Sequence, residues 1–211
     1  MIGFPALRII ILALSSFIAV AGLSGCGSQT LSYGQDTRNK MIVSVRDQKM
    51  LLVRDGSPVK SYKISTSKFG LGDRPGSNCT PIGRLQVAKK IGDHAPLGSV
   101  FKTRRPTGEV LKPNAPGRDP VVTRIMWLTG TESRNQNAFR RTIYIHGTPE
   151  EGRLGSPASF GCIRMGSTDV ADLYNRIGMG ADVFVIRGSI QPKKDGQESA
   201  SVDSHSFGPR G

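Results

Sequence analysis

Residues 142–165, TIYIHGTPEEGRLGSPASFGCIRM, carry the pattern that decides the fold and the chemistry of this chain. The apolar residues 142–145 predict a β-strand that ends at His146, and Gly147 lets the chain turn at the rim of a sheet. Cys162 follows His146 by sixteen positions. A thiol is a useful nucleophile only as the thiolate, which a neighbouring base can generate. His146 and Cys162 therefore form a candidate catalytic pair.

The residues next to Cys162 suit the same chemistry. The backbone N–H groups of Gly161 and Cys162 can face a developing oxyanion. Arg164 lies on the side of Cys162 if the segment is extended, and from there its guanidinium can bind a substrate carboxylate. The alternatives are structural, since a lone cysteine is usually a small buried hydrophobe and a lone histidine is often a structural residue. No second Cys or His stands at ligand spacing from either residue, so a metal site is not expected.

Two motifs in this region resemble a known family. H-G-T at residues 146–148, followed by S-x-G-C-I-R-M at residues 159–165, resembles the signature of the L,D-transpeptidase (YkuD-like) catalytic domain. T-P-I-G-R-L at residues 80–85 is similar to the upstream T-P-x-G-x-[FL] element of that family. The resemblance covers about residues 40–188. It implies a mainly β, L,D-transpeptidase-like β-sandwich with one short helix after the cysteine motif.

The resemblance also implies a peptidoglycan L,D-transpeptidase without a cofactor. Cys162 would be the acyl-accepting nucleophile, His146 its general base, and the carbonyl of Gly147 would orient the imidazole. The enzyme would cleave the bond between the stem-peptide diaminoacid and D-alanine. The acyl group would then pass to an amine, which gives a 3→3 cross-link, D-amino acid exchange or attachment to a protein lysine.

The remaining motif residues take supporting roles by the same resemblance. Ser159 would hydrogen bond within the motif, the backbone at Gly161 would complete the oxyanion site, and Arg164 would hold the substrate loop or a stem carboxylate. Phe160 departs from the family, because many members have His there. Cys79 is expected to be a buried bystander, a free thiol or a disulfide partner of Cys162. Two rival functions stay open: an L,D-carboxypeptidase or endopeptidase that uses water, and a non-catalytic, lipid-anchored wall-binding protein.

Outside the motifs, the sequence predicts a mostly β domain over residues 40–190. Alternating or apolar runs predict strands at residues 41–45, 50–53, 59–65, 84–89, 121–128 and 182–186. Asp55-Gly56 predicts a hairpin turn. A helix is expected to begin with Ser167 as its cap and to end before Gly178.

The N-terminal residues predict export and a lipid anchor. Residues 9–21 are an apolar run of thirteen residues, which suits a signal peptide better than a membrane span of roughly twenty. The following L-S-G-C resembles a lipobox, so residues 1–25 would be a lipoprotein signal peptide and Cys26 would be lipidated. Residues 26–39 would be a tether and residues 191–211 a disordered tail. The domain would face the periplasm, and Gly27 rather than Asp after the lipid predicts the outer membrane in a two-membrane host.

The charge is strongly positive. The chain holds 29 Lys and Arg against 16 Asp and Glu, a formal charge of +13. Such an excess suggests a polyanionic partner. For an exported domain, carboxylate-bearing wall polymers or anionic lipid head groups are expected rather than nucleic acid; a basic surface kept for solubility is the alternative. Only three cysteines occur, which excludes a dense disulfide framework.

Overall fold

The structure is a computed structural model that describes residues 35–190. The predicted signal peptide, Cys26, most of the tether and the 191–211 tail lie outside the described residues. Between residues 35 and 190, no helix is long and apolar enough to cross a membrane. The strands are β1 (Asn39–Ser44), β2 (Lys49–Arg54), β3 (Ser57–Ser65), β4 (Gly83–Ile91), β5 (Ser99–Lys102), β6 (Arg105–Val110), β7 (Val121–Gly130), β8 (Tyr144–Gly147), β9 (Ile163–Met165) and β10 (Asp182–Ile186). The helices are α1 (Ser167–Arg176) and the 3-10 turns η1 (Ser133–Asn135) and η2 (Glu151–Arg153).

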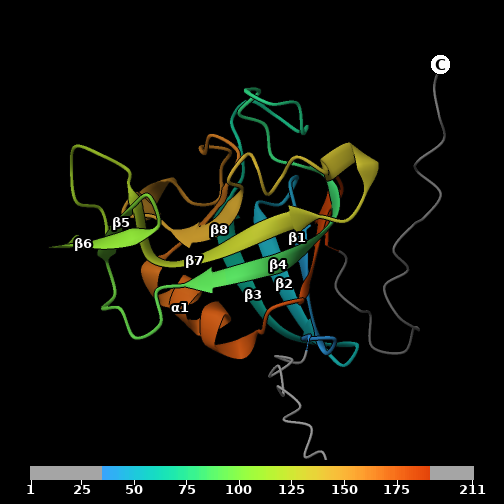
Figure 1. Cartoon of the computed structure of the whole chain (residues 1–211), viewed down its shortest axis with the longest axis horizontal. Coiled ribbons are helices and arrows are strands. Elements are labelled where there is room, and N and C mark those ends of the chain that lie inside the picture. The colour runs from blue at the N-terminus through green and yellow to red at the C-terminus, as the bar shows by residue number, and fades with distance from the viewer. Residues whose placement is uncertain (1–34, 191–211) are drawn as a thin grey trace, which may run out of the picture. The chain divides into compact units, whose positions relative to one another are not determined.

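The strands of the described region form one sheet that closes on itself. Its order is β4-β10-β1-β2-β3-β9-β8-β7-β5-β6, and β4 also pairs with β7. The strands from β4 to β7 therefore make a ring, and the β5–β6 hairpin branches from β7 outside it. In Figure 1, β4 and β7 cross the front of the domain side by side, and the hairpin projects at the left. The expectation of a mainly β fold with one short helix after the cysteine motif is confirmed.

The first three strands form the expected antiparallel meander. Between β2 and β3, Asp55 has φ +50° and Gly56 has φ +81°. Positive φ at both central residues is the requirement of a type I′ turn, whose twist matches the twist of the strands that it joins. β1 then pairs in parallel with β10, which brings the end of the domain back beside its beginning.

The main hydrophobic core collects buried side chains from both the ring and the helix. From α1 it takes Val170, Leu173 and Tyr174, which recur at helical spacing. From the central strands it takes Ile145 of β8 and Ile163 of β9, both fully buried. These two residues are directly paired across the strands. Core packing therefore fixes β8, which carries His146, and β9, which begins directly after Cys162.

The start of α1 differs from the expectation. Ser167 is the first helical residue rather than the cap, and the cap position is Gly166, which has no side chain to offer. The Ser167 N–H instead donates to a carboxylate oxygen of Glu151, at 2.8 Å. A carboxylate is favourable there because the first N–H groups of a helix lack partners and carry partial positive charge. The helix ends as expected, with Ile177 as C-cap and Gly178 immediately after it.

Three strands were not expected from the sequence. β5 and β9 are only four and three residues long, which is too short for alternation to be read. β6 contains Pro106 and Gly108, two residues that are depleted in strands. β8 begins two residues later than predicted and includes His146 and Gly147. His146 thus lies within the strand, one residue before its end, rather than at its end.

We expect Ile145→Ala to lower the free energy of unfolding by about 2–5 kcal/mol, because it leaves a cavity where a fully buried side chain packed. Urea denaturation of the full chain measures this loss. Val59→Ala is the control, since Val59 is 41% exposed and its truncation should change stability by less than about 0.5 kcal/mol. Equal losses in the two variants would contradict the assignment of Ile145 to the core.

Candidate active site

His146 and Cys162 lie on one face of the sheet. β8 and β9 pair in parallel, with Ile145 opposite Ile163 and His146 opposite Arg164. Because side chains alternate along a strand, the face opposite the core carries Tyr144 and His146 from β8. On the other strand, that face carries Arg164 and, two residues before it, Cys162. His146 and Cys162 are therefore diagonal neighbours on this face. Among the described residues no hydrogen bond joins the imidazole to the sulfur.

The Cys162 sulfur lies in a mostly apolar setting. It packs against a small cluster of Phe101, Ile125 and Tyr144. Sγ accepts from the Tyr144 N–H at 3.4 Å and lies 3.5 Å from the Thr142 carbonyl oxygen. The side chain is partly exposed, yet burial of the sulfur raises the pKa of the thiol to about 11. The thiol is thus protonated at neutral pH and needs a base.

His146 is buried, with 5% of the residue exposed. Its Nδ1 lies 2.8 Å from the carbonyl oxygen of Gly147. A carbonyl only accepts, so Nδ1 carries the proton and Nε2 keeps a free lone pair. Burial lowers the pKa of His146 to about 4. At neutral pH the ring is uncharged and able to take a proton at Nε2.

A network of hydroxyls holds the turn that precedes Cys162. The Ser159 hydroxyl donates to the Cys162 carbonyl at 2.5 Å and accepts from the Gly161 N–H at 3.2 Å. The buried Thr80 hydroxyl donates to the Gly161 carbonyl at 3.0 Å, which ties the T-P-I-G-R-L element to the cysteine motif. The Gly161 N–H is thus already in use. Among the described residues the Cys162 N–H has no acceptor, and it is the amide of this pair left for an oxyanion.

Arg164 binds protein carboxylates. Its Nη1 donates to Asp119, in the loop before β7, and to Glu150 at 3.2 Å. The Thr148 hydroxyl also donates to Asp119. Only 4% of the Arg164 side chain is exposed, and its Nε and Nη2 have no partner within residues 35–190. Arg164 thus joins residues 119 and 150, and its expected role toward the substrate loop or a stem carboxylate stays a prediction.

Aromatic side chains border the site on two sides. On one side Trp127 stacks on Phe139, with ring centroids 4.1 Å apart, and meets Tyr144 edge-on at 5.6 Å. Arg104, at the tip of the β5–β6 hairpin, lies over the Trp127 ring and donates to the Tyr144 hydroxyl at 3.2 Å. On the other side Phe160, the departure from the motif, is 63% exposed. The side chain at position 160 thus points to solvent, where its ring lies against Phe69 and Lys68.

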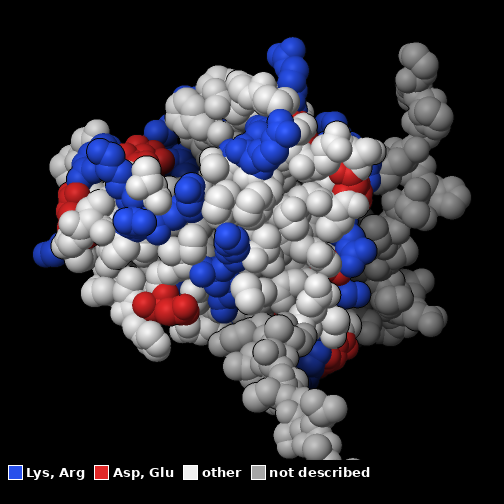
Figure 2. Space-filling view, in the orientation of Figure 1, with Lys and Arg blue, Asp and Glu red and all other residues white. Residues whose placement is uncertain are grey.

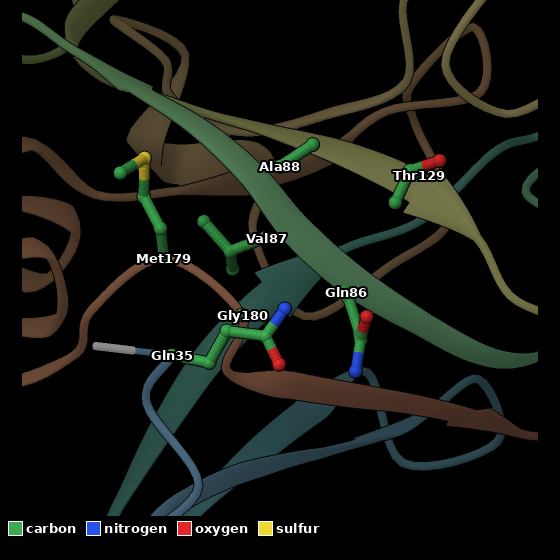
Figure 3. A pocket seen from close by; sticks show the side chains of 7 residues that line it. All are labelled: Gln35, Gln86, Val87, Ala88, Thr129, Met179 and Gly180. Carbon is green, nitrogen blue, oxygen red and sulfur yellow. The ribbon is translucent and has the colours of Figure 1, made fainter. Parts of the chain in front are cut away.

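Three other features were candidates for a role in the site: Cys79, a metal cluster and a separate cavity. Cys79 and Cys162 are both free thiols, so Cys79 is not a disulfide partner here, and it is half-buried rather than buried. Between residues 35 and 190 no cluster of three His, Cys, Asp or Glu side chains could hold a metal ion. Figure 3 shows a cavity lined from β4, β7, the segment before β1 and the turn before β10. Its volume is about 320 Å³. Its lining contains no acid, base or thiol and consists of Gln35, Gln86, Val87, Ala88, Thr129, Met179 and Gly180.

The domain is mainly β, and a cysteine and a neutral histidine lie on one face of its sheet. The chain belongs to the L,D-transpeptidase catalytic domain (YkuD) family, whose model matches residues 38–186. The match takes in both motifs and the strands of the ring.

Solved structures of L,D-transpeptidases are similar to the chain at low identity. That from Mycobacterium smegmatis is 17% identical, with 71% of this chain and 58% of that chain covered and a TM-score of 0.46. One from Mycobacterium tuberculosis H37Rv is 20% identical, with 71% and 58% covered and a TM-score of 0.46. One from Enterococcus faecium is 18% identical, with 71% and 50% covered and a TM-score of 0.46. The chain thus spans less than two thirds of these proteins. A search of curated proteins finds no match.

Several residues around the pair were not expected from the sequence. Asp119 and Glu150 hold Arg164, and Arg141 and Asp73 form a buried ion pair behind the cysteine turn. Each partner is distant in sequence or lies in a loop, so no spacing rule points to it. Buried charged side chains are nearly always paired, so the burial of Arg164 by itself indicates that carboxylates lie nearby.

We expect the alkylation of Cys162 by iodoacetamide to accelerate steadily from pH 6 to pH 10 without a plateau in the acidic range. The thiol pKa is raised to about 11 and the imidazole pKa is lowered to about 4, so the resting pair is uncharged between these values. Peptide-resolved mass spectrometry of the full chain measures the rate at Cys162 separately from Cys79. A pH-independent rate between about pH 5 and 7 would reveal a resting thiolate–imidazolium pair instead.

Proposed function

We propose that this protein is a peptidoglycan L,D-transpeptidase in which Cys162 is the nucleophile and His146 the general base. The observation that carries the proposal is the state of His146: a neutral ring, with its tautomer set by the Gly147 carbonyl, on the same sheet face as the thiol. Membership of the family supports the reaction class. Stem peptides are the proposed substrate, and the leaving group is the terminal D-alanine.

The first half-reaction forms a thioester. The Cys162 thiol proton moves to Nε2 of His146 as sulfur attacks the carbonyl carbon of the stem diaminoacid. The carbonyl oxygen becomes an oxyanion, which the Cys162 N–H can stabilise. When the carbon–nitrogen bond breaks, the imidazolium returns its proton to the departing amine. D-alanine leaves as a neutral amine, and the acyl group remains on sulfur.

The second half-reaction consumes the thioester. An acceptor amine loses a proton to His146 as its nitrogen attacks the acyl carbon, and the imidazolium then protonates the departing sulfur. The thioester retains the free energy of the cleaved amide, so no ATP is required. A stem side-chain amine gives a 3→3 cross-link, a D-amino acid gives exchange, and a protein lysine gives attachment. Water in the same position gives the rival carboxypeptidase reaction.

The pKa values favour a proton transfer that accompanies attack. Both groups are uncharged at pH 7, because burial disfavours the charged form of each. A resting ion pair is therefore not needed. The charge separation develops when substrate is present, and the Nδ1 hydrogen bond to Gly147 then stabilises the imidazolium.

The proposed partners fit the charge of the surface. Figure 2 shows Lys and Arg side chains gathered over the β5–β6 hairpin, with acidic side chains among them. The hairpin contributes Lys102, Arg104 and Arg105. Such groups attract the carboxylates of wall polymers at long range, an effect that salt screens. The lipid anchor at Cys26, and with it export to a membrane facing the periplasm, belongs to the same proposal.

We expect Cys162→Ala to abolish D-alanine release from disaccharide-tetrapeptides, with at least a 10³-fold fall in rate, because no other group can form the acyl-enzyme. Mass spectrometry of the products, with and without a D-amino acid acceptor, measures the reaction. Cys79→Ala is the matched thiol control and should keep its activity. Continued release by Cys162→Ala would refute the nucleophile, whereas hydrolysis that dominates despite saturating acceptor would establish the carboxypeptidase.

We also expect a carbapenem to acylate Cys162. The intact mass of the full chain should rise by one drug molecule, and peptide mapping should locate the adduct on Cys162 rather than Cys79. His146→Gln should slow the adduct by about 10²-fold or more, since the base is lost. An unmodified mass after prolonged incubation would count against an assembled nucleophile.

A further inference from the structure

Arg141 is a buried cation at the base of the cysteine turn. Its side chain is 8% exposed, and the side chain of its partner Asp73 is 5% exposed. One guanidinium nitrogen, Nη1, donates to Asp73 at 2.9 Å and to the Gly72 carbonyl at 3.0 Å. The other, Nη2, donates to the Cys79 carbonyl at 2.7 Å. Three acceptors thus fix the position and the plane of the guanidinium, as its rigid fork allows.

Arg141 adjoins two contacts of the cysteine turn, one at the Cys162 sulfur and one at Gly161. The next residue, Thr142, has φ +55°, which is rare for a β-branched side chain, and its carbonyl oxygen lies 3.5 Å from Sγ. The Cys79 carbonyl, which accepts from Arg141, packs against Gly161, where an added Cβ would lie 3.2 Å from that oxygen. The strained residue 142 and the close approach at 161 persist because the surrounding contacts hold them.

The other basic side chains near Cys162 are neutral, paired with carboxylates or separated from the sulfur by the Tyr144 ring. His146 shares its sheet face but is neutral, and Arg164 is compensated by two carboxylates. Arg104 lies beyond the Tyr144 ring, on its hydroxyl. Arg141 is the charged side chain whose field lowers the pKa of the Cys162 thiol, against the larger effect of burial. Its Nη2 is one hydrogen bond away from the Cys79 carbonyl, and that carbonyl packs against Gly161, the residue before Cys162. This contact places the guanidinium close to the cysteine turn although Asp73 is bonded to it.

We propose that Arg141 is a positioning residue that stabilises the thiolate of Cys162 by its fixed positive charge. This role rests on the proposed function, in which Cys162 is the nucleophile. Negative charge gathers on sulfur as its proton leaves and again when the thioester breaks. A guanidinium locked by three acceptors supplies positive potential at both moments without having to reorient. Asp73 holds the guanidinium in place and opposes its field.

The test is the rate of Cys162 alkylation by iodoacetamide at pH 8 in the full chain, read by peptide-resolved mass spectrometry. Arg141→Gln should slow it about threefold. Loss of a nearby cation raises the thiol pKa by about one unit, which removes nine tenths of the thiolate, while the more basic sulfur recovers about a factor of three. Arg141→Lys, which keeps the charge, should fall between the wild type and Arg141→Gln. Arg140→Gln removes an equal charge from an exposed neighbour and should leave the rate unchanged.

Asp73→Asn separates the electrostatic role from a structural one. It breaks the same ion pair as Arg141→Gln but leaves the cation, so its alkylation rate should stay unchanged or rise. If Arg141 only braces the turn, both variants should shift the rate in the same direction, and a slower Asp73→Asn would overturn the proposal even if Arg141→Gln failed to fold. Circular dichroism checks folding. Alkylation needs no stem peptide, so D-alanine release by Cys162→Ala would refute the enzyme without deciding the role of Arg141.

Discussion

The parallel pairing of β8 with β9 is the constraint on which the remaining geometry depends. Its register places Ile145 and Ile163 together in the core and turns His146 and Arg164 to the opposite face. A slip of one residue would bury the imidazole among apolar side chains and expose an isoleucine. Burial of the two isoleucines therefore determines where the polar side chains of His146 and Arg164 lie, although these side chains are not part of the core. β9 holds this register with three residues because it pairs with β3 on its other side.

Local patterns in the sequence were sufficient where a structure depends on near neighbours. The Asp55-Gly56 turn and the alternation of β3 are of this kind, and so is the spacing of apolar residues in α1. They failed where a distant partner decides. The start of α1 depends on Glu151, which competes successfully with the capping that Ser167 would provide in isolation. β6 forms in spite of its own proline because β5 offers it a partner.

The same division applies to the site. The cysteine and histidine could be named from a motif, since two residues with rare chemistry stand in a recognisable order. Their protonation states could not, because these follow from burial by residues across the sheet. The partners of the buried arginines also depend on the fold. The carboxylates that pair with these arginines all belong to loop residues, namely Asp73, Asp119 and Glu150. Ion pairs, rather than the hydrogen bonds of a strand or helix, therefore hold these side chains in place. Removing one member of a pair buried on both sides, such as Arg141–Asp73, typically costs about 3–5 kcal/mol.

The β5–β6 hairpin has a consequence for the dynamics of the domain. Every residue of β6 is exposed, and in the described region this strand pairs only with β5. Its amides should therefore exchange with solvent deuterium through sub-global opening, well below the free energy that unfolds the ring. Arg104 at the tip lies over the Trp127 ring in a cation–π contact and donates one hydrogen bond to the Tyr144 hydroxyl. These two contacts are weak enough to break on a fast timescale. β5 stays paired with β7 through Val100 and Phe101, so β6 and the tip can open while β5 and the eight-stranded ring remain in place.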